Sequence, residues 1–95
     1  MSFAFVTQVQ FQEGSDPVVG QKLLESDVIP RVKSQAGFQK GTWFRNTDGK
    51  TGIGAVVFDT EANARAAVEA FGSQPRPAEA PTITSTGVYE VVAEV

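Results

Sequence analysis

Two residue types are absent from this 95-residue sequence, which has no cysteine and no histidine. Without cysteine, disulfide cross-links and thiolate metal sites are excluded. Without histidine, the chain lacks the commonest general base, the commonest metal ligand and the usual axial ligand of haem. A run of about 18 apolar residues, the length of a membrane-spanning helix, is also missing. We therefore expect no bound metal, no cofactor and no membrane partner.

The charge of the chain is low and unevenly distributed. The formal net charge is −3, yet residues 31–50 hold five basic side chains and Asp48 as their one acid. The acidic total argues against binding to a phosphate backbone, so we expect no nucleic-acid partner. Residues 1–8 contain neither the basic segment nor the long apolar stretch of a signal peptide, and we expect a cytoplasmic protein.

The length and the hydrophobic pattern predict one domain, residues 1–95, of ferredoxin-like βαββαβ order. Residues 3–11 alternate between apolar and polar side chains, which predicts a strand. Asp16 followed by Pro17 is typical of a helix start. Pro30 cannot donate to a helical ladder, so we expect this helix to kink or restart there, with Asp27 as a second cap.

Two further strands, residues 38–45 and 52–58, flank the turn at 46–49. Its Asn, Asp and Gly suit a type I turn closed by a left-handed glycine, which makes a three-residue hairpin loop with a bulge. A two-residue Asp-Gly turn is the alternative. The choice matters because a shift of one residue moves every side chain of a strand to the opposite face.

The second half of the chain predicts one more helix and one more strand. Asp59 or Thr60 caps the alanine-rich helix, and Gly72 ends it. Residues 73–81 carry three prolines and no periodicity, which indicates a loop. Residues 82–95 form the last predicted strand of a four-stranded antiparallel sheet.

The bulged turn gives the sheet two unequal faces. It pairs Trp43 with Ile53, Gly41 with Ala55 and Phe38 with Phe58. The glycine-bearing side of the hairpin would admit the helices, which leaves an apolar outer face that should not stay in water. We therefore expect a homodimer formed through this outer face. The residues placed on it are Phe3, Phe5, Val9, Gln39, Gly41, Trp43, Arg45, Ile53, Ala55 and Val57.

Three passages of the sequence carry a resemblance to a known family. They are the passage from the first helix into the second strand (residues 28–33, 37–38 and 41–45), residues 55–59, and residues 88–91. In these passages the chain resembles the dimeric α/β-barrel superfamily, specifically its small antibiotic-biosynthesis-monooxygenase-like members. The resemblance implies a barrel closed across a dimer, with a ligand inside it or between sheet and helices. Several members oxidise aromatic substrates with O₂ and no cofactor, whereas others degrade haem.

The resemblance also implies a candidate pocket. Trp43 resembles the pocket tryptophan of some members, and Arg45 and Tyr89 could contact a phenolic or quinone-like ligand, with Phe5 and Ile53 beside them. Each residue has a plainer alternative. Trp43 could be an interface or core aromatic, Arg45 a solvated charge at a strand end, and Tyr89 a core residue with its hydroxyl at the rim. Catalytic residues cannot be named.

The sequence is compatible to different degrees with an RNA-recognition domain, a small-molecule-binding module and an enzyme. An RNA-recognition domain has the same βαββαβ order, but Ile53 and Ala55 stand where its base-stacking aromatics belong. The favoured interpretation is a small-molecule-binding or accessory module without catalytic machinery. The alternative is a cofactor-independent monooxygenase-like enzyme acting on an aromatic or quinone-like molecule. A cavity of about 300 Å³ or more beside Trp43 and Arg45 favours the enzyme, whereas a solidly packed lumen excludes it.

Overall fold

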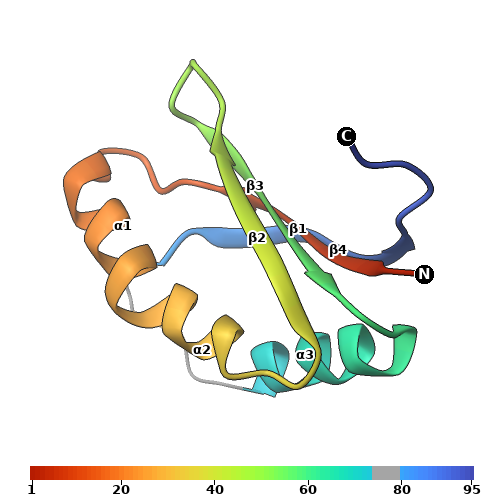
Figure 1. Ribbon diagram of the computed structural model, residues 1–95. Helices are drawn as coiled ribbons and strands as arrows, with labels where there is room; N and C mark the ends of the chain where they lie inside the picture. The colour runs from red at the N-terminus through yellow and green to blue at the C-terminus, as the bar shows by residue number, and fades with distance from the viewer. Residues whose placement is uncertain (74–79) are drawn as a thin grey trace.

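The computed structural model describes residues 1–73 and 80–95 as a sheet with its helices on one face (Figure 1). The four antiparallel strands lie in the order β2-β3-β1-β4, so the predicted βαββαβ fold is confirmed. Residues 74–79, which fall within the predicted loop 73–81, lie outside the described residues. No helix among the described residues is long and apolar enough to cross a membrane. The elements are β1 (Phe3–Gln10), α1 (Pro17–Leu23), η1 (Leu24–Val28), α2 (Ile29–Lys33), β2 (Phe38–Arg45), β3 (Thr51–Phe58), α3 (Glu61–Ser73) and β4 (Thr82–Glu90).

The core lies between α3 and the centre of the sheet. Phe58 is completely buried, and Phe5 and Val56 beside it are 4% exposed. Ala64 and Ala67 of α3 pack against them, because a helix surface of methyl groups can approach a sheet closely. By contrast, no residue of α1 or η1 is buried. The first helical segment, from α1 through η1 to α2, thus packs on the core through Val28 and Val32 near its C-terminal end, whereas α1 stands off from the sheet.

The β2–β3 turn differs from the prediction by one residue. Gly49 has φ 74° and donates its N–H to the carbonyl oxygen of Asn46 at 2.8 Å, as the predicted type I turn with a left-handed glycine requires. The N–H of Asn46, however, donates to the carbonyl oxygen of Thr51. Lys50 therefore belongs to the loop as well, and the loop has four residues instead of three.

The longer loop moves β2 by one position along β3. The predicted pairs Trp43–Ile53 and Gly41–Ala55 are wrong, and the observed pairs are Trp43–Gly54 and Gly41–Val56. The predicted pair Phe38–Phe58 is present because a bulge between Phe38 and Lys40 restores the register there.

This shift corrects the assignment of the faces. The glycine-bearing side of β3 faces the helices as predicted, but Trp43 and Arg45 lie on that side too. Strand β1 is also reversed relative to the prediction, since Phe5 pairs with Val56 on the helix side, where Phe3 and Val9 lie as well. Ile53, Ala55 and Val57 lie on the outer face as predicted. They are joined there by residues that the prediction did not place on it, namely Ala4, Val6, Thr42, Phe44 and Tyr89.

The first helix runs through Pro30 without restarting. Asp16 caps it as predicted, with its Oδ1 accepting from the N–H of Val18 at 2.9 Å. Ahead of the proline the ladder widens into the π-helical turn η1, in which the N–H of Ile29 donates to the carbonyl of Leu24. This wider turn accommodates a residue that has no N–H. The predicted second cap at Asp27 is therefore wrong.

Two predicted boundaries change in the second half of the chain. Thr60 is the cap of α3, because its Oγ1 accepts from the N–H of Asn63 at 3.1 Å. The helix continues past Gly72 to Ser73. The last strand ends at Glu90 rather than at the C-terminus, although Val91 still donates to the Ser2 carbonyl.

Candidate ligand-binding site

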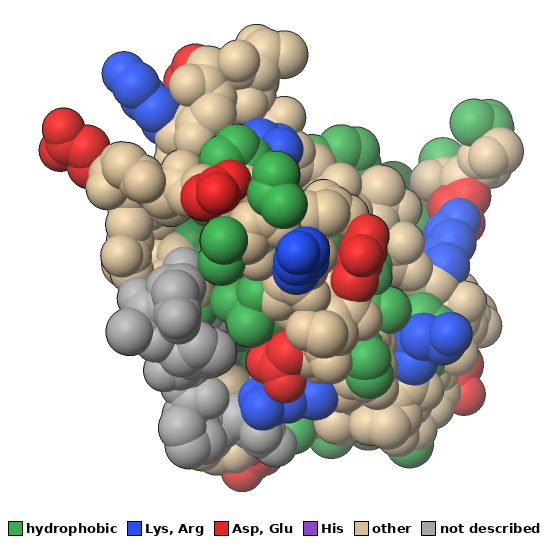
Figure 2. All heavy atoms as spheres, turned by 90° about the vertical axis from the view of Figure 1, so that its left-hand side faces the viewer, with side chains coloured by type: hydrophobic (Ala, Val, Ile, Leu, Met, Phe, Trp, Pro, Cys, Tyr) green, Lys and Arg blue, Asp and Glu red, His purple; other side chains and the backbone are tan. Residues whose placement is uncertain are grey.

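A cavity of about 600 Å³ lies between the first helical segment and the sheet. It exists because α3 makes the closer contacts with the sheet, which leaves the space under α1 and η1 unfilled. Figure 2 views the molecule from the side of α1 and shows hydrophobic side chains gathered there among charges of both signs. The apolar lining includes Phe5, Val9, Phe11, Val19, Leu23, Leu24, Val28, Val32, Trp43, Val56 and Phe71.

The floor of the cavity is the Trp43 indole, which lies across the backbone of two glycines. A Cβ added at Gly41 would lie 2.8 Å from Cη2 of the indole, and one added at Gly54 would lie 2.9 Å from its Cδ1 and Nε1. Such distances are too short for real side chains, so both positions must be glycine for the ring to lie flat. The register Trp43–Gly54 produces this arrangement directly.

The indole N–H is available to a ligand. Trp43 makes no hydrogen bond to another described residue. Among those residues, every buried side-chain nitrogen or oxygen does have a partner. The Nε1 of Trp43 is therefore not fully buried, and solvent reaches it. A flat aromatic surface with a free donor at its edge suits a planar ligand that carries an acceptor oxygen.

At the hairpin end, Phe11 and Arg45 continue the floor. A Cβ at Gly52 would lie 3.0 Å from Cζ of Phe11, so this ring covers a third glycine of the sheet. The Arg45 guanidinium carbon lies 5.9 Å from the centroid of the Phe11 ring, within the range of a cation–π contact. No carboxylate of the described residues lies within ion-pair distance of Arg45.

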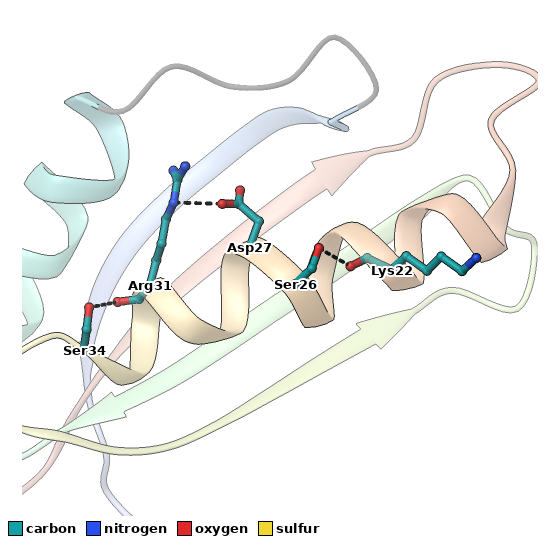
Figure 3. Close-up of polar contacts among 5 residues, drawn as sticks. All are labelled: Lys22, Ser26, Asp27, Arg31 and Ser34. Carbon is teal, nitrogen blue, oxygen red and sulfur yellow. Dashed lines mark hydrogen bonds and ion pairs between the residues drawn. The ribbon is translucent and has the colours of Figure 1, made fainter.

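The helical wall of the cavity carries one ion pair. Arg31 Nε lies 3.0 Å from Asp27 Oδ1, and both residues line the cavity. Figure 3 shows the two side chains extending from the same side of the helix. In the π-helical turn, the hydroxyl of Ser26 donates to the Lys22 carbonyl at 2.7 Å, as Figure 3 also shows. Because π-helical turns occur frequently at functional sites, this part of the wall is a reasonable place for ligand contacts.

The structure brings four of the five sequence-predicted site residues to this cavity. Phe5, Trp43 and Arg45 present their side chains on its side of the sheet, whereas Ile53 borders it at the hairpin end with its side chain on the outer face. Tyr89 lies apart, 56% exposed on the outer face with its ring across Gly87.

Sequence reasoning did not identify Phe11, Asp27 and Arg31 as lining residues. The spacing of Asp27 and Arg31 is the usual four-residue spacing of a helical ion pair, which would have placed them side by side. Nothing in that spacing indicates that the pair faces a cavity.

The residues present do not fit a haem or metal site. The sequence offers neither histidine nor cysteine, and its single tyrosine, Tyr89, lies on the other face of the sheet. No group of three potential metal-binding side chains occurs among the described residues. Haem ligation of the kinds proteins commonly use thus has no ligand in this cavity.

Comparison with known proteins identifies the fold. No protein-family model and no curated protein sequence match the chain. SnoaB, described as a cofactor-independent oxygenase from Streptomyces nogalater, matches with a TM-score of 0.71 over 99% of this chain and 96% of its own, at 16% identity. The chain shares the fold of SnoaB.

Two other structures with this fold were solved with ligands. The monooxygenase from ActVA-Orf6 of Streptomyces coelicolor, in complex with Nanaomycin D, has a TM-score of 0.65 at 16% identity over 99% of this chain and 90% of its own. The heme-degrader MhuD from Mycobacterium tuberculosis, with two hemes in its active site, has a TM-score of 0.67 at 16% identity over 98% of each chain. At such identities the likeness establishes the shared fold and no more.

Proposed function

We propose that this protein binds a planar aromatic small molecule in the cavity between its sheet and its first helical segment. The observation that carries the proposal is the cavity of about 600 Å³ floored by the Trp43 indole. Ligand pockets of about 300–1,000 Å³ are typical of small-molecule sites. The cavity also exceeds the volume of about 300 Å³ that favours the enzyme over a packed lumen, so its size supports the second candidate function below as well.

The expected pose follows from the two walls. The ligand rings stack in an offset manner on the indole, while Leu23, Leu24 and Val28 cover them from the helical side. The indole N–H donates to a carbonyl or phenol oxygen at the ligand edge. Quinones and hydroxylated polycyclic aromatics meet both requirements.

Fluorescence of Trp43, the only tryptophan, provides the test. We expect anthraquinone and naphthoquinone derivatives to quench it in a saturable manner. By calorimetry, Trp43→Phe should keep the stacking but lose the indole hydrogen bond, which contributes about 0.5–1.5 kcal/mol. Trp43→Leu should lose about tenfold more, since aromatic stacking contributes about 0.5–1.5 kcal/mol beyond area burial. A panel of polycyclic aromatics that neither quench nor release heat contradicts the proposal.

A second candidate function is a cofactor-independent monooxygenase reaction on such a ligand. It is favoured by the fold shared with SnoaB and the ActVA-Orf6 protein, whose names describe oxygenase activity. In a balanced reaction a ring CH₂ takes one oxygen atom of O₂ to become a carbonyl, and its two hydrogens leave with the other atom as water. An oxygen electrode with an anthrone as substrate tests this. Uptake that does not exceed the buffer rate excludes the enzyme and leaves the binding module.

We also propose that two copies of the chain pair through the outer face of the sheet. Phe44 and Tyr89 are each 56% exposed there, and Ile53 is 41% exposed. An exposed apolar sheet face of this kind is typical of an interaction surface, and a two-fold pair covers it on both partners at once.

A further inference from the structure

We propose that the ligand of this cavity is an aromatic acid whose anionic oxygen binds Arg45. This inference rests on the proposed function and names the class of ligand. The cavity is apolar under the helix and has the Arg45 guanidinium at its hairpin end, so its two ends suit different parts of one molecule. A ring system fits the indole floor, and an acidic group fits the position beyond Phe11.

The charges that line the cavity are not equally available. Arg31 is paired with Asp27 at 3.0 Å, and the Asp16 carboxylate accepts the capping hydrogen bond of Val18. Arg45 has no such partner among the described residues. A ligand carboxylate or phenolate therefore reaches Arg45 without displacing an existing ion pair.

Two contacts place Arg45, which is exposed, at the hairpin end of the cavity. Arg45 is the last residue of β2, and its backbone pairs with that of Gly52. Its guanidinium lies over the Phe11 ring. A guanidinium held against an aromatic face keeps its N–H donors at its edge, where they match the two oxygens of a carboxylate. Phe11, which covers Gly52, thus acts as a platform for Arg45.

Glu13 is the remaining charge at the cavity. It lies in the exposed turn after β1, and its side chain makes no contact with another described residue that would aim it inward. A carboxylate there disfavours an anionic ligand only weakly, because solvent screens it. Glu13→Gln should accordingly leave the affinity for an aromatic acid unchanged or slightly raised.

A matched pair of ligands, anthraquinone-2-carboxylate and its uncharged carboxamide, tests the inference by calorimetry. We expect the wild-type protein to bind the carboxylate about tenfold more tightly, since hydrogen bonds to charged groups contribute more than neutral ones. Arg45→Gln should equalise the two affinities, and Arg45→Lys should restore part of the preference. Lys50→Gln, which removes an equal charge from the same hairpin without touching the cavity, should leave the preference intact.

The outcomes separate the two proposals. If the wild type binds neither ligand, the cavity does not function as proposed and this inference fails with it. If both ligands bind equally, or if the preference survives Arg45→Gln, the binding site stands and the role of Arg45 is wrong. A preference lost in Arg31→Gln but kept in Arg45→Gln would assign the acid to Arg31 instead. Unchanged carboxamide binding shows that each variant is folded.

Discussion

Gly37 connects the end of the first helical segment to the sheet. Its φ is 79°, and its carbonyl accepts from the N–H of Asp59 at 3.0 Å. A Cβ at this position would lie 2.1 Å from Asp59 Oδ1, which itself accepts from Asn63 Nδ2 at 2.7 Å. Both the backbone conformation and the contact therefore require glycine.

Comparing two alanine variants separates these requirements. Gly14 has nearly the same conformation, φ 77°, but has nothing within 4 Å of an added Cβ. Gly14→Ala should lose about 1 kcal/mol of unfolding free energy from the left-handed conformation alone. Gly37→Ala should lose at least about 1 kcal/mol more, because Asp59 must move, and that difference lowers the Tm of a domain of this size by about 4–8 °C. Equal losses in urea denaturation would show that the Asp59 contact is unimportant.

At the scale of the element, α1 is the least secure part of the site. It has seven residues, none of them buried, and a helix of that length is marginal by itself. Its first turn is anchored by the Asp16 cap. The continuous passage through η1 into α2, where Val32 is buried, connects this exposed end to the core.

Removing the cap should therefore affect the ligand site more than the fold. Asp16→Ala should cost about 1 kcal/mol locally, speed amide hydrogen exchange across residues 17–23 and weaken ligand binding about threefold or more. Asp16→Asn keeps a capping oxygen and should behave like the wild type. A loss of affinity as large in Asp16→Asn as in Asp16→Ala would mean that the carboxylate charge, and not the cap, is responsible.

The order of the elements could be predicted from sequence, but the faces of the sheet could not. Capping signals at Asp16 and Thr60 and the glycine of the turn are local, and the structure retains them. The alternation in β1 separates a side of large apolar residues, Phe3, Phe5 and Val9, from a more polar side, and the larger side packs against the helices. The prediction set this local signal aside and placed the large side next to Trp43 on the outer face. That choice depended on the turn, where one additional loop residue, Lys50, reverses the side chains of residues 41–45 of β2.

The candidate site shows the same limit at the scale of the whole molecule. Trp43 and Arg45 could be singled out by residue type, but the prediction placed them on the outer face. The cavity arises because α3 packs on the sheet and α1 does not. This difference in packing depends on the alanines of α3 and on the π-helical turn η1. No single sequence motif indicates it.

The proposed dimer is the prediction that concerns the whole molecule. Val6 lies near the middle of the outer face, between Ala55 and Gly87 on the neighbouring strands, and it does not line the cavity. In sedimentation equilibrium at micromolar concentration, we expect the wild type to have twice the 10.1 kDa mass of one chain. Val6→Lys should shift it toward the single-chain mass, because a two-fold axis brings the new charges together. Val18→Lys, on exposed α1, is the control that should remain dimeric, and a wild type that sediments only as a single chain refutes the interface.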